Sequence, residues 1–306
     1  MRRALVALVL VVSLPPAAAP PSRAQQPTDW SKVEIKTEKV ADGVWMLSGR
    51  GGNIAVSAGA DGVFLGDGDF APLTERIVAA VRTLSDQPVR WLLDTHWHGD
   101  HVGSNENLAR AGALVIAHEN VRERMSHEEY IASFDRKVPA SPAAALPRLT
   151  FRDTLALHVN GDTLLIVHIP PAHTDGDAVV WFERADVLQT GDLFFNGLYP
   201  VIDISNGGSI DGMIRASDLL LARVGPSTRI IPGHGPLGDR AALQRFHDML
   251  VHARAEVWAM VDKGMTVDAI VAAKPTADLD AVWGQGGMPP EVFDKEVAMD
   301  LVRLRR

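Results

Sequence analysis

The sequence predicts an α/β fold in which two mixed β-sheets are packed together and flanked by layers of helices, an αββα sandwich. Two observations support this prediction. Strand-like and helix-like segments follow one another in the order strands, helix, strands, helix, and this order occurs twice. The composition is that of an ordinary globular protein, with 46% hydrophobic residues, which is enough to fill a sizeable core. The two halves show no repeat in sequence.

The first 24 residues have the features of a secretory signal peptide. Arg2 and Arg3 give the segment a positive start, and residues 4–14 form an apolar run that is too short to span a bilayer. Residues 17–19 and 22–24 each offer a small-residue cleavage site. We therefore expect a mature chain of about 280 residues in the periplasm or secreted from the cell. Because the chain has no cysteine, it has neither disulfides nor a lipidation site.

The charge of the chain argues against nucleic acid as a partner. Residues 1–24 contain three arginines and no acidic residue, so their removal takes the net charge from −8 to −11. A protein this acidic is repelled by a phosphate backbone. No later apolar run is long enough for a membrane span. We expect a small-molecule substrate and no span in the mature protein, and the oligomeric state stays open.

The first half of the folded chain is expected to contain most of the first sheet. Hydrophobic alternation and turn residues predict strands at 33–40, 44–47, 53–58 and 62–67, a helix at 73–84, a strand at 89–93, a helix at 104–110 and a strand at 113–117. Residues 127–148 are rich in Pro and Ala and form a long connector. Such a segment is either a substrate lid or a plain linker.

The second half is expected to supply the second sheet and most of the helices. The same patterns predict strands at 153–159, 162–169, 178–182, 187–190 and 229–232, and helices at 209–224, 240–263, 266–274 and 291–306. We expect residues 33–240 to form a catalytic domain and the helices within residues 241–306 to dock on that same domain.

The chemistry of the chain is concentrated in the segment Thr95-His96-Trp97-His98-Gly99-Asp100-His101, which lies between a predicted strand and a predicted helix. Buried charge is costly unless it is paired or ligated, so packing does not explain this cluster. His96 and His98 share one side while the chain is extended, whereas Asp100 and His101 follow a turn and address a second point nearby. Imidazole and carboxylate are ligands for zinc and similar divalent metals, so the segment predicts a metal site.

At these residues the chain resembles the metallo-β-lactamase superfamily. That family carries H-x-H-x-D-H, followed by a distant His, an Asp and a last His. This sequence has His173, Asp192 and His234 in the same order, each in a loop after an apolar run. The resemblance covers roughly residues 33–240 and implies the metallo-β-lactamase fold.

The resemblance implies a dinuclear metal site. In this interpretation one metal is held by His96, His98 and His173, and the other by Asp100, His101 and His234. Asp192 bridges the two metals. Two Zn²⁺ ions per chain are expected, although iron or manganese also suits these donors. A metal-bound hydroxide would be the nucleophile, and Asp100 would accept or relay a proton. An aspartate at the position of Asp67 supports the metal loop in the family, and a solvated turn residue is the equal alternative.

The substrate class is less clearly indicated. One group of zinc β-lactamases uses a cysteine ligand, which this chain lacks, and the pair Gly191-Asp192 is more similar to glyoxalase II and the lactonases. Export and the absence of a basic cluster near the ligand loops argue against a glutathione thioester. We therefore favour a β-lactam narrowly, with a lactonase or thioesterase as the alternative.

Several side chains beside the ligand loops are candidate walls of a substrate pocket. Asn196 is the best candidate for a polar substrate contact, although a structural role in its turn competes. For Trp97 and Phe194 ordinary packing is the stronger expectation. Tyr199 and Phe195 are the other two candidate pocket residues.

Two functions from other classes stay open. A mononuclear iron persulfide dioxygenase would need only two His and one Asp, whereas the complete set with Asp100, His101 and His234 favours two metals. A binding protein with a decayed site is disfavoured by the same set. The remaining histidines are expected to be surface residues at His118 and His127 and ordinary strand residues at His158 and His168.

Overall fold

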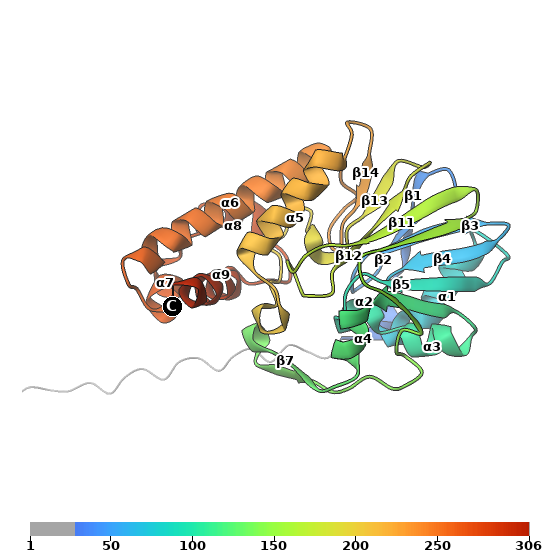
Figure 1. Ribbon diagram of the computed structural model, residues 1–306, viewed down its shortest axis with the longest axis horizontal. Coiled ribbons are helices and arrows are strands. Elements are labelled where there is room, and N and C mark those ends of the chain that lie inside the picture. Colours follow the sequence, from blue (N-terminus) through green and yellow to red (C-terminus); the bar gives the residue numbers. More distant parts are fainter. Residues whose placement is uncertain (1–27, 306) are drawn as a thin grey trace, which may run out of the picture.

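A computed structural model describes residues 28–305, so the predicted signal peptide at 1–24 lies outside the described residues. The described chain forms two large sheets that face each other, with helices on both outer faces (Figure 1). This arrangement confirms the predicted αββα sandwich. None of the helices formed by residues 28–305 combines the length and the apolar composition that crossing a membrane requires.

The first sheet has seven strands, and its parallel part delivers the central motif. The strand order is β1 (Lys36–Ala41), β2 (Val44–Ser48), β3 (Ile54–Gly59), β4 (Gly62–Gly66), β5 (Val89–Asp94), β6 (Leu114–His118) and β9 (Leu149–Phe151). Strands β1 to β4 form an antiparallel meander, whereas β4, β5, β6 and β9 are parallel. The carboxyl ends of parallel strands lie at one edge of a sheet, so Asp67 and Thr95 emerge side by side.

The second sheet brings the distant ligand loops to the same place. Its order is β10 (Thr154–Val159), β11 (Asp162–His168), β12 (Ala178–Phe182), β13 (Val187–Gln189) and β14 (Arg229–Ile231). Because β14 pairs with β13 in parallel, both strands end at one edge, and β12 begins there. The backbone N–H of Ala178 donates to the carbonyl of Thr95 at 2.8 Å, which joins this edge to the first sheet.

Three hydrophobic clusters hold the layers together. Between the sheets, Phe64 of β4 meets Phe182 of β12 edge to face, with ring centroids 6.0 Å apart. On the outer face of the first sheet lie α1 (Thr74–Arg82) and α3 (Asn105–Arg110). On the outer face of the second sheet lie α5 (Ile210–Arg223) and α6 (Arg240–Asp262). Burial of these apolar side chains is the main stabilising contribution to the fold.

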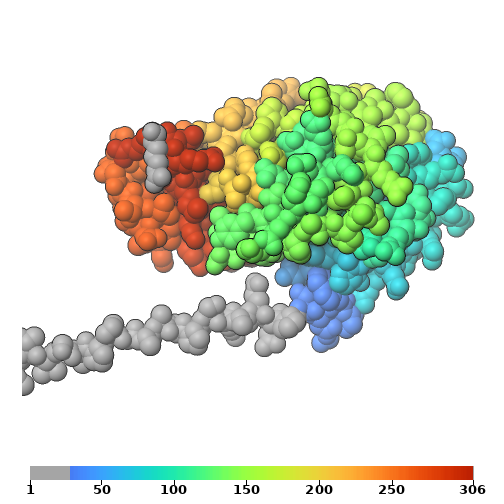
Figure 2. All heavy atoms as spheres, turned by 60° about the horizontal axis from the view of Figure 1, so that its bottom comes forward, coloured from blue at the N-terminus to red at the C-terminus, as the bar shows by residue number. Residues whose placement is uncertain are grey.

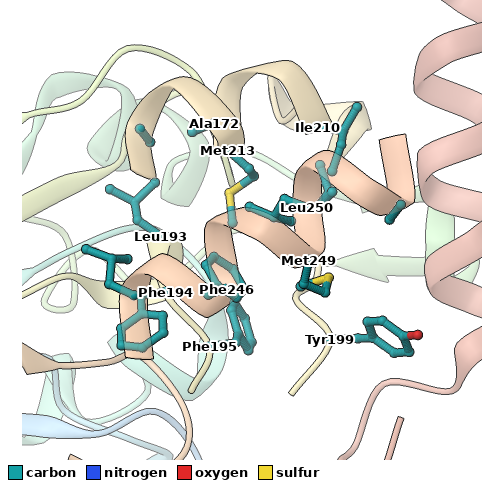
Figure 3. Packing of buried hydrophobic residues seen from close by; sticks show 14 of the residues in the cluster. Ala172, Leu193, Phe194, Phe195, Tyr199, Ile210, Met213, Phe246, Met249 and Leu250 are labelled. Atoms are coloured by element: carbon teal, nitrogen blue, oxygen red, sulfur yellow. The ribbon is translucent and has the colours of Figure 1, made fainter. Parts of the chain in front are cut away.

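The C-terminal helices continue the third cluster. Helices α7 (Val267–Ala273), α8 (Asp280–Trp283) and α9 (Pro290–Leu304) pack around α6, and their buried apolar side chains share its core. Figure 3 shows Met213 of α5 and Leu250 of α6 beside Leu193, which directly follows the predicted ligand Asp192. The core beneath the C-terminal helices therefore extends to the predicted metal site.

Residues 127–148, expected to be a lid or a plain linker, contain a small hairpin of their own. Helix α4 (Glu119–Met125) leads into β7 (Glu129–Ile131), a 3-10 turn at Ala132–Phe134, and β8 (Arg136–Val138). The backbone N–H of Ala132 donates to the hydroxyl of Ser205 at 3.0 Å. Figure 2 shows this green segment at the surface, where it meets the C-terminal helices.

His118 corrects one sequence prediction, because it is buried rather than on the surface. Its Nδ1 accepts a hydrogen bond from the backbone N–H of Asn120 and caps α4. Its ring stacks on His168 with centroids 3.8 Å apart, and burial lowers the pKa of His118. His127 is exposed as predicted, and His158 and His168 are partnered strand residues, bonded to Thr163 and to the carbonyl of Asp177.

Candidate metal centre

All seven predicted metal ligands meet between the two sheets, at the edge where β5, β13 and β14 end. His96 and His98 follow β5, and the short helix α2 (Gly99–Val102) carries the next two predicted ligands. The other three come from the loop before β12, from the 3-10 turn Gly191–Leu193 after β13, and from the loop after β14. They form two groups, one of His96, His98, His173 and Asp192 and one of Asp100, His101 and His234.

The first group, which we name the closed half, has the spacing of a four-coordinate zinc site. In a tetrahedral site with bonds of about 2.0–2.1 Å, neighbouring donor atoms lie about 3.3 Å apart. Here His98 Nδ1 lies 2.9 Å from His173 Nε2. Asp192 Oδ2 lies 3.5 Å from His173 Nε2 and 3.7 Å from His96 Nε2. His96 Nε2 is buried and has no hydrogen-bond partner among the described residues, as expected for a metal donor.

The second group, the open half, shares the carboxylate of Asp192. Asp192 Oδ1 lies 3.1 Å from His101 Nε2 and 3.5 Å from His234 Nε2. Asp100 Oδ2 lies 3.3 Å from His234 Nε2 and 3.7 Å from His101 Nε2. Asp192 therefore turns one oxygen to each half. The donor set and its spacing fit a pair of divalent metals.

Burial and mutual charge set the protonation states of these groups in the protein alone. Burial lowers the pKa of His173 to about 4 and, together with neighbouring imidazoles, holds the pKa of His96 well below its usual range. Burial opposes ionisation of Asp192, but the imidazoles around it hold its pKa well below the usual range. Neutral imidazole and ionised carboxylate are the forms that bind metal.

The open half differs in its charge. Burial acts against protonation of His101 and His234, but the nearby carboxylates outweigh it. The pKa of His234 rises to about 9, and that of His101 also lies well above its usual value. In the protein alone, protons on these two rings offset the charge of Asp100 and Asp192.

Three of the ligand imidazoles are held from behind by an outer hydrogen-bond acceptor. His98 Nε2 donates to Asp203 at 2.9 Å, and His173 Nδ1 donates to the carbonyl of Val201 at 2.7 Å. His101 Nδ1 donates to Asp67 at 3.0 Å. These bonds fix which ring nitrogen faces the centre, Nδ1 in His98 and Nε2 in the other two.

Two roles were open for Asp67, support of the loop at 95–101 or a solvated turn residue, and the structure shows the first. Its carboxylate accepts hydrogen bonds from the backbone N–H of Thr95 at 2.8 Å and from the Thr95 hydroxyl at 2.9 Å. Because that hydroxyl donates to Asp67, it is an acceptor for His96 Nδ1, which lies 3.1 Å away. Asp67 itself has a φ of 70°, which places its carboxylate under the loop.

Sequence reasoning missed the network behind Asp203. Asn206 donates to both oxygens of the Asp203 carboxylate at 2.9 and 2.8 Å, and Arg124 of α4 donates to Asn206 Oδ1 at 3.2 Å. Arg124 also pairs with Asp175, in the loop that carries His173, at 2.6 Å. One arginine thus ties the loop that carries His173 to the loop that carries Asp203 and Asn206. The signal in the sequence was weak, three polar residues at 203–206 with Ile204 between them.

A second missed element is the glycine-rich loop at 49–53. The backbone N–H of Gly52 donates to the carbonyl of Asp100 at 3.1 Å. The side chain of Asn53 donates to the carbonyls of Pro232 and Gly235 at 3.0 and 2.9 Å, on either side of His234. The signal in the sequence was Gly49-Arg50-Gly51-Gly52 itself, since such a run permits close approach of backbone to a site.

Two of the five candidate pocket residues, Tyr199 and Trp97, are buried in apolar clusters. Tyr199 is only 1% exposed and belongs to the apolar cluster drawn in Figure 3. It stacks on Phe293 of α9, and its hydroxyl donates to the carbonyl of Thr276 between α7 and α8. Trp97 is also buried, in the apolar cluster between α4 and β7, where its ring meets His98 edge-on. Both residues therefore pack rather than line a pocket.

Asn196 and Phe195 lie beside the open half. The side chain of Asn196 is half-buried and donates to the carbonyl of Pro236 at 2.8 Å, so it holds its turn. Phe195 stacks on the His234 ring with centroids 5.0 Å apart. Phe194 packs on Phe246 in the core, in agreement with the role expected from the sequence.

Comparison with known proteins agrees with this geometry. The metallo-beta-lactamase type 2 of Bacteroides fragilis is 21% identical over 56% of this chain and 63% of its own length. The hydroxyacylglutathione hydrolase of a Polaromonas species is 27% identical over 53% of this chain and 55% of its own length. The chain thus spans less than two thirds of the length of these two relatives.

Solved structures share the fold. A metallo-beta-lactamase from Pontibacter korlensis superposes with a TM-score of 0.59 at 21% identity, covering 71% of this chain and 99% of its own. The family model described as the metallo-beta-lactamase superfamily matches residues 57–234, which is more than half of the chain and includes all seven predicted ligands. The resemblance noted in the sequence is confirmed, and the protein belongs to the metallo-β-lactamase superfamily.

Proposed function

We propose that this protein is an exported dinuclear zinc hydrolase that opens an amide, lactone or ester bond. The observation that carries the proposal is the placement of Asp192, which turns one carboxylate oxygen to each of two donor groups. A carboxylate shared in this way suits two metals rather than one. The names of the two relatives, a metallo-beta-lactamase and a hydroxyacylglutathione hydrolase, support hydrolysis.

The residues present account for most of what such a reaction needs. One zinc would be held by His96, His98 and His173. The other zinc would be held by Asp100, His101 and His234. Asp192 would contribute to both. Bound zinc would lower the pKa of a water molecule and polarise the scissile carbonyl. The outer partners Asp203 and Asp67 keep the imidazoles oriented, and burial of the closed half excludes bulk water.

Asp100 is placed to handle a proton. Burial acts to raise its pKa, but His101 and His234 hold the pKa of Asp100 well below its usual range. The position of Asp100 suits a proton-accepting role, because its carboxylate is 27% exposed and lies on the accessible side of the centre, where an attacking water would arrive.

The preferred substrate within this class is a β-lactam, by a narrow margin over a lactone or a thioester. Asp192 resembles the hydrolases of thioesters and lactones, whereas the predicted export fits a substrate found outside the cytoplasm. The first measurement is therefore hydrolysis of a chromogenic cephalosporin by zinc-loaded protein that begins near Gln25. A kcat/KM of about 10⁴ M⁻¹s⁻¹ or more would support a β-lactamase. Turnover only of lactones or thioesters would move the assignment to those classes.

Metal analysis tests the dinuclear proposal separately. Two zinc ions per chain with hydrolytic activity are expected. One iron per chain together with oxygen consumption on a persulfide would contradict the hydrolase and favour the dioxygenase alternative. Export is tested by cell fractionation, with N-terminal sequencing of the protein recovered from the periplasm; an intact N-terminus in the cytoplasm would refute it.

A further inference from the structure

The hairpin formed by β7 and β8 belongs to neither large sheet. Its strands pair with each other in a separate two-stranded sheet, outside the layers of the sandwich (Figure 1). A two-stranded hairpin is at best marginally stable in water on its own, so its position depends on contacts with the rest of the chain. Three consecutive residues, Tyr130, Ile131 and Ala132, connect it to the surroundings of the closed half.

Two of these residues bond the loop that carries Asp203. The backbone N–H of Ala132 donates to the Ser205 hydroxyl at 3.0 Å, and that hydroxyl donates to the Asp203 carboxylate at 3.1 Å. The carbonyl of Tyr130 accepts a hydrogen bond at 3.1 Å from the side chain of Asn206, which also donates to Asp203. The backbone of the hairpin is therefore bonded to two side chains that both hold the Asp203 carboxylate.

The third residue supports another neighbour of the same metal ligand. The side chain of Ile131 is 2% exposed and belongs to the apolar cluster that contains Trp97. The Trp97 ring meets the His98 ring edge-on, with centroids 4.8 Å apart. His98 is thus contacted by Trp97 and by Asp203, and the hairpin supports both of them.

The hairpin is built to open without unfolding of the whole protein. Of its ten residues, 129–138, only Ile131 and Ser133 are buried, and Ser205, the hydrogen-bond partner of Ala132, is exposed. A segment with few buried side chains and solvent-exposed hydrogen bonds opens locally at a lower free energy than global unfolding requires. Docking of the hairpin is therefore an equilibrium that a ligand can shift.

We propose that docking of the hairpin at 129–138 sets how tightly the closed half holds its metal. The docked hairpin steadies Asp203 and Trp97, which keep the His98 ring turned with Nδ1 toward the other donors. An undocked hairpin leaves the ring without this support, and a ligand that loses its outer partner binds metal more weakly. Ser205 is a positioning residue, since it acts on His98 only through Asp203. The inference rests on metal binding in the closed half and does not depend on which bond is hydrolysed.

Reciprocity tests the proposal in the unmodified protein. If docking strengthens metal binding in the closed half by some factor, metal binding strengthens docking by the same factor. We expect amide hydrogen exchange over residues 129–138 to be about 10- to 100-fold slower in zinc-loaded than in metal-free protein. His98→Ala should abolish this difference. His234→Ala, which removes a ligand of the open half, should retain it.

Ala132→Pro removes one backbone N–H, and with it the bond from the hairpin to Ser205. The position suits proline, because Ala132 begins a 3-10 turn and Ile131 before it is extended, with φ −102° and ψ 99°. We expect the affinity of the closed half for Co²⁺, followed by its absorption spectrum, to fall about threefold to tenfold, with the open half unchanged. Lys137→Ala removes an exposed ion pair between the hairpin and Glu128 and is the matched control, which should change neither half.

Changes of Ser205 separate the hairpin from the carboxylate. Ser205→Ala removes the bond to the hairpin and the bond to Asp203, so its loss of closed-half affinity should exceed that of Ala132→Pro. Ser205→Thr keeps the hydroxyl and should bind Co²⁺ as wild type does. Ser205 borders a hollow of about 210 Å³, which leaves space for the added methyl group.

The outcomes distinguish this inference from a structural role and from the proposed function. Equal exchange over 129–138 with and without metal would overturn the inference, as would equal weakening of both halves in Ala132→Pro. If Ser205→Ala weakens the closed half but Ala132→Pro does not, the hydroxyl acts on Asp203 without the hairpin, and the inference is again overturned. If the zinc-loaded protein hydrolyses no β-lactam, lactone or thioester, the proposed function fails, whereas the exchange and Co²⁺ measurements still decide the role of the hairpin.

Discussion

The two halves of the metal centre are built in different ways. The closed half consists of three histidines and one oxygen of Asp192, is almost fully buried, and is held by a network that runs through Asp203 and Asn206 to Arg124. The open half contains Asp100 and His234, which are partly exposed, and it is bordered by a glycine-rich loop. Under the proposed function, this difference would divide the labour, so that the closed half would retain its metal and the open half would meet the substrate.

The largest effect on activity is expected from a change of Asp192, the residue that both halves share. Asp192→Asn keeps the shape of the side chain but removes the charge that both halves share. We expect kcat/KM to fall by at least about a thousandfold, as for loss of a principal electrostatic group, and zinc content to fall below two per chain. Kinetics and elemental analysis measure both effects. Full zinc occupancy with unchanged activity would show that the carboxylate does not bridge.

Loss of the outer partner of His98 tests the closed half alone. Asp203→Ala removes the acceptor that orients this ring, so we expect metal affinity of the closed half to weaken by about 10- to 100-fold. Titration with cobalt, followed by its absorption spectrum, measures the affinity of each half. Arg124→Met should give a smaller loss in the same half, whereas Asp218→Ala, at an exposed position on α5, should give none. Equal weakening of both halves would contradict the division.

The same comparison shows what the sequence could predict. The four predicted ligands at 96–101 followed from His and Asp at close spacing after an apolar strand, and the strands from their periodicity. His173, Asp192 and His234 followed from the resemblance to the motif of the family. The outer network was not predicted, because it joins residues far apart in the chain. His98 and Asp203 are 105 residues apart, Arg124 and Asn206 are 82 apart, and Asn53 reaches Pro232 across 179.

The errors in side-chain position have a related cause. Tyr199 follows a ligand loop in the sequence, but its hydroxyl is bonded to Thr276, between α7 and α8, and to Asp280 of α8, which sequence proximity does not reveal. His118 looked like a surface residue because its stacking partner, His168, belongs to the other sheet. Local pattern thus indicates which chemistry is present, whereas tertiary packing decides which side chains face it.

A smaller effect on activity is expected from the loop that borders the open half. In Gly52→Ala the new methyl group would lie 2.1 Å from Cε1 of the His101 ring, so the loop or the ring must move. We expect kcat/KM to fall about tenfold, since a shift of the order of 1 Å in a catalytic group has effects of this order or more. Gly99→Ala is the matched control, because a methyl group there meets nothing within 4 Å. If both variants lose activity equally, the crowding at Gly52 is not the cause.

The smallest effect on activity, and a clear effect on stability, is expected at Glu296 of α9. This buried carboxylate accepts a hydrogen bond at 2.8 Å from the backbone N–H of Ile202, which precedes Asp203. Burial raises the pKa of Glu296 to about 8. Because the folded state holds this proton more tightly than the unfolded state, its stabilising contribution is complete at low pH. It is lost as the pH rises from about 4.5, the pKa in the unfolded chain, to about 8.

Glu296→Gln keeps a neutral hydrogen-bonding side chain and should remove this pH dependence. Relative to wild type, its free energy of unfolding should rise by about 3 kcal/mol between pH 5 and pH 8. Urea unfolding at several pH values measures the difference, and Glu256→Gln, on the surface of α6, is the control. Because Ile202 leads directly to Asp203, loss of metal from the closed half above pH 8 should also be slower in Glu296→Gln. If the two proteins differ in stability but lose metal from that half at the same rate, then the C-terminal helices stabilise the fold without steadying the closed half.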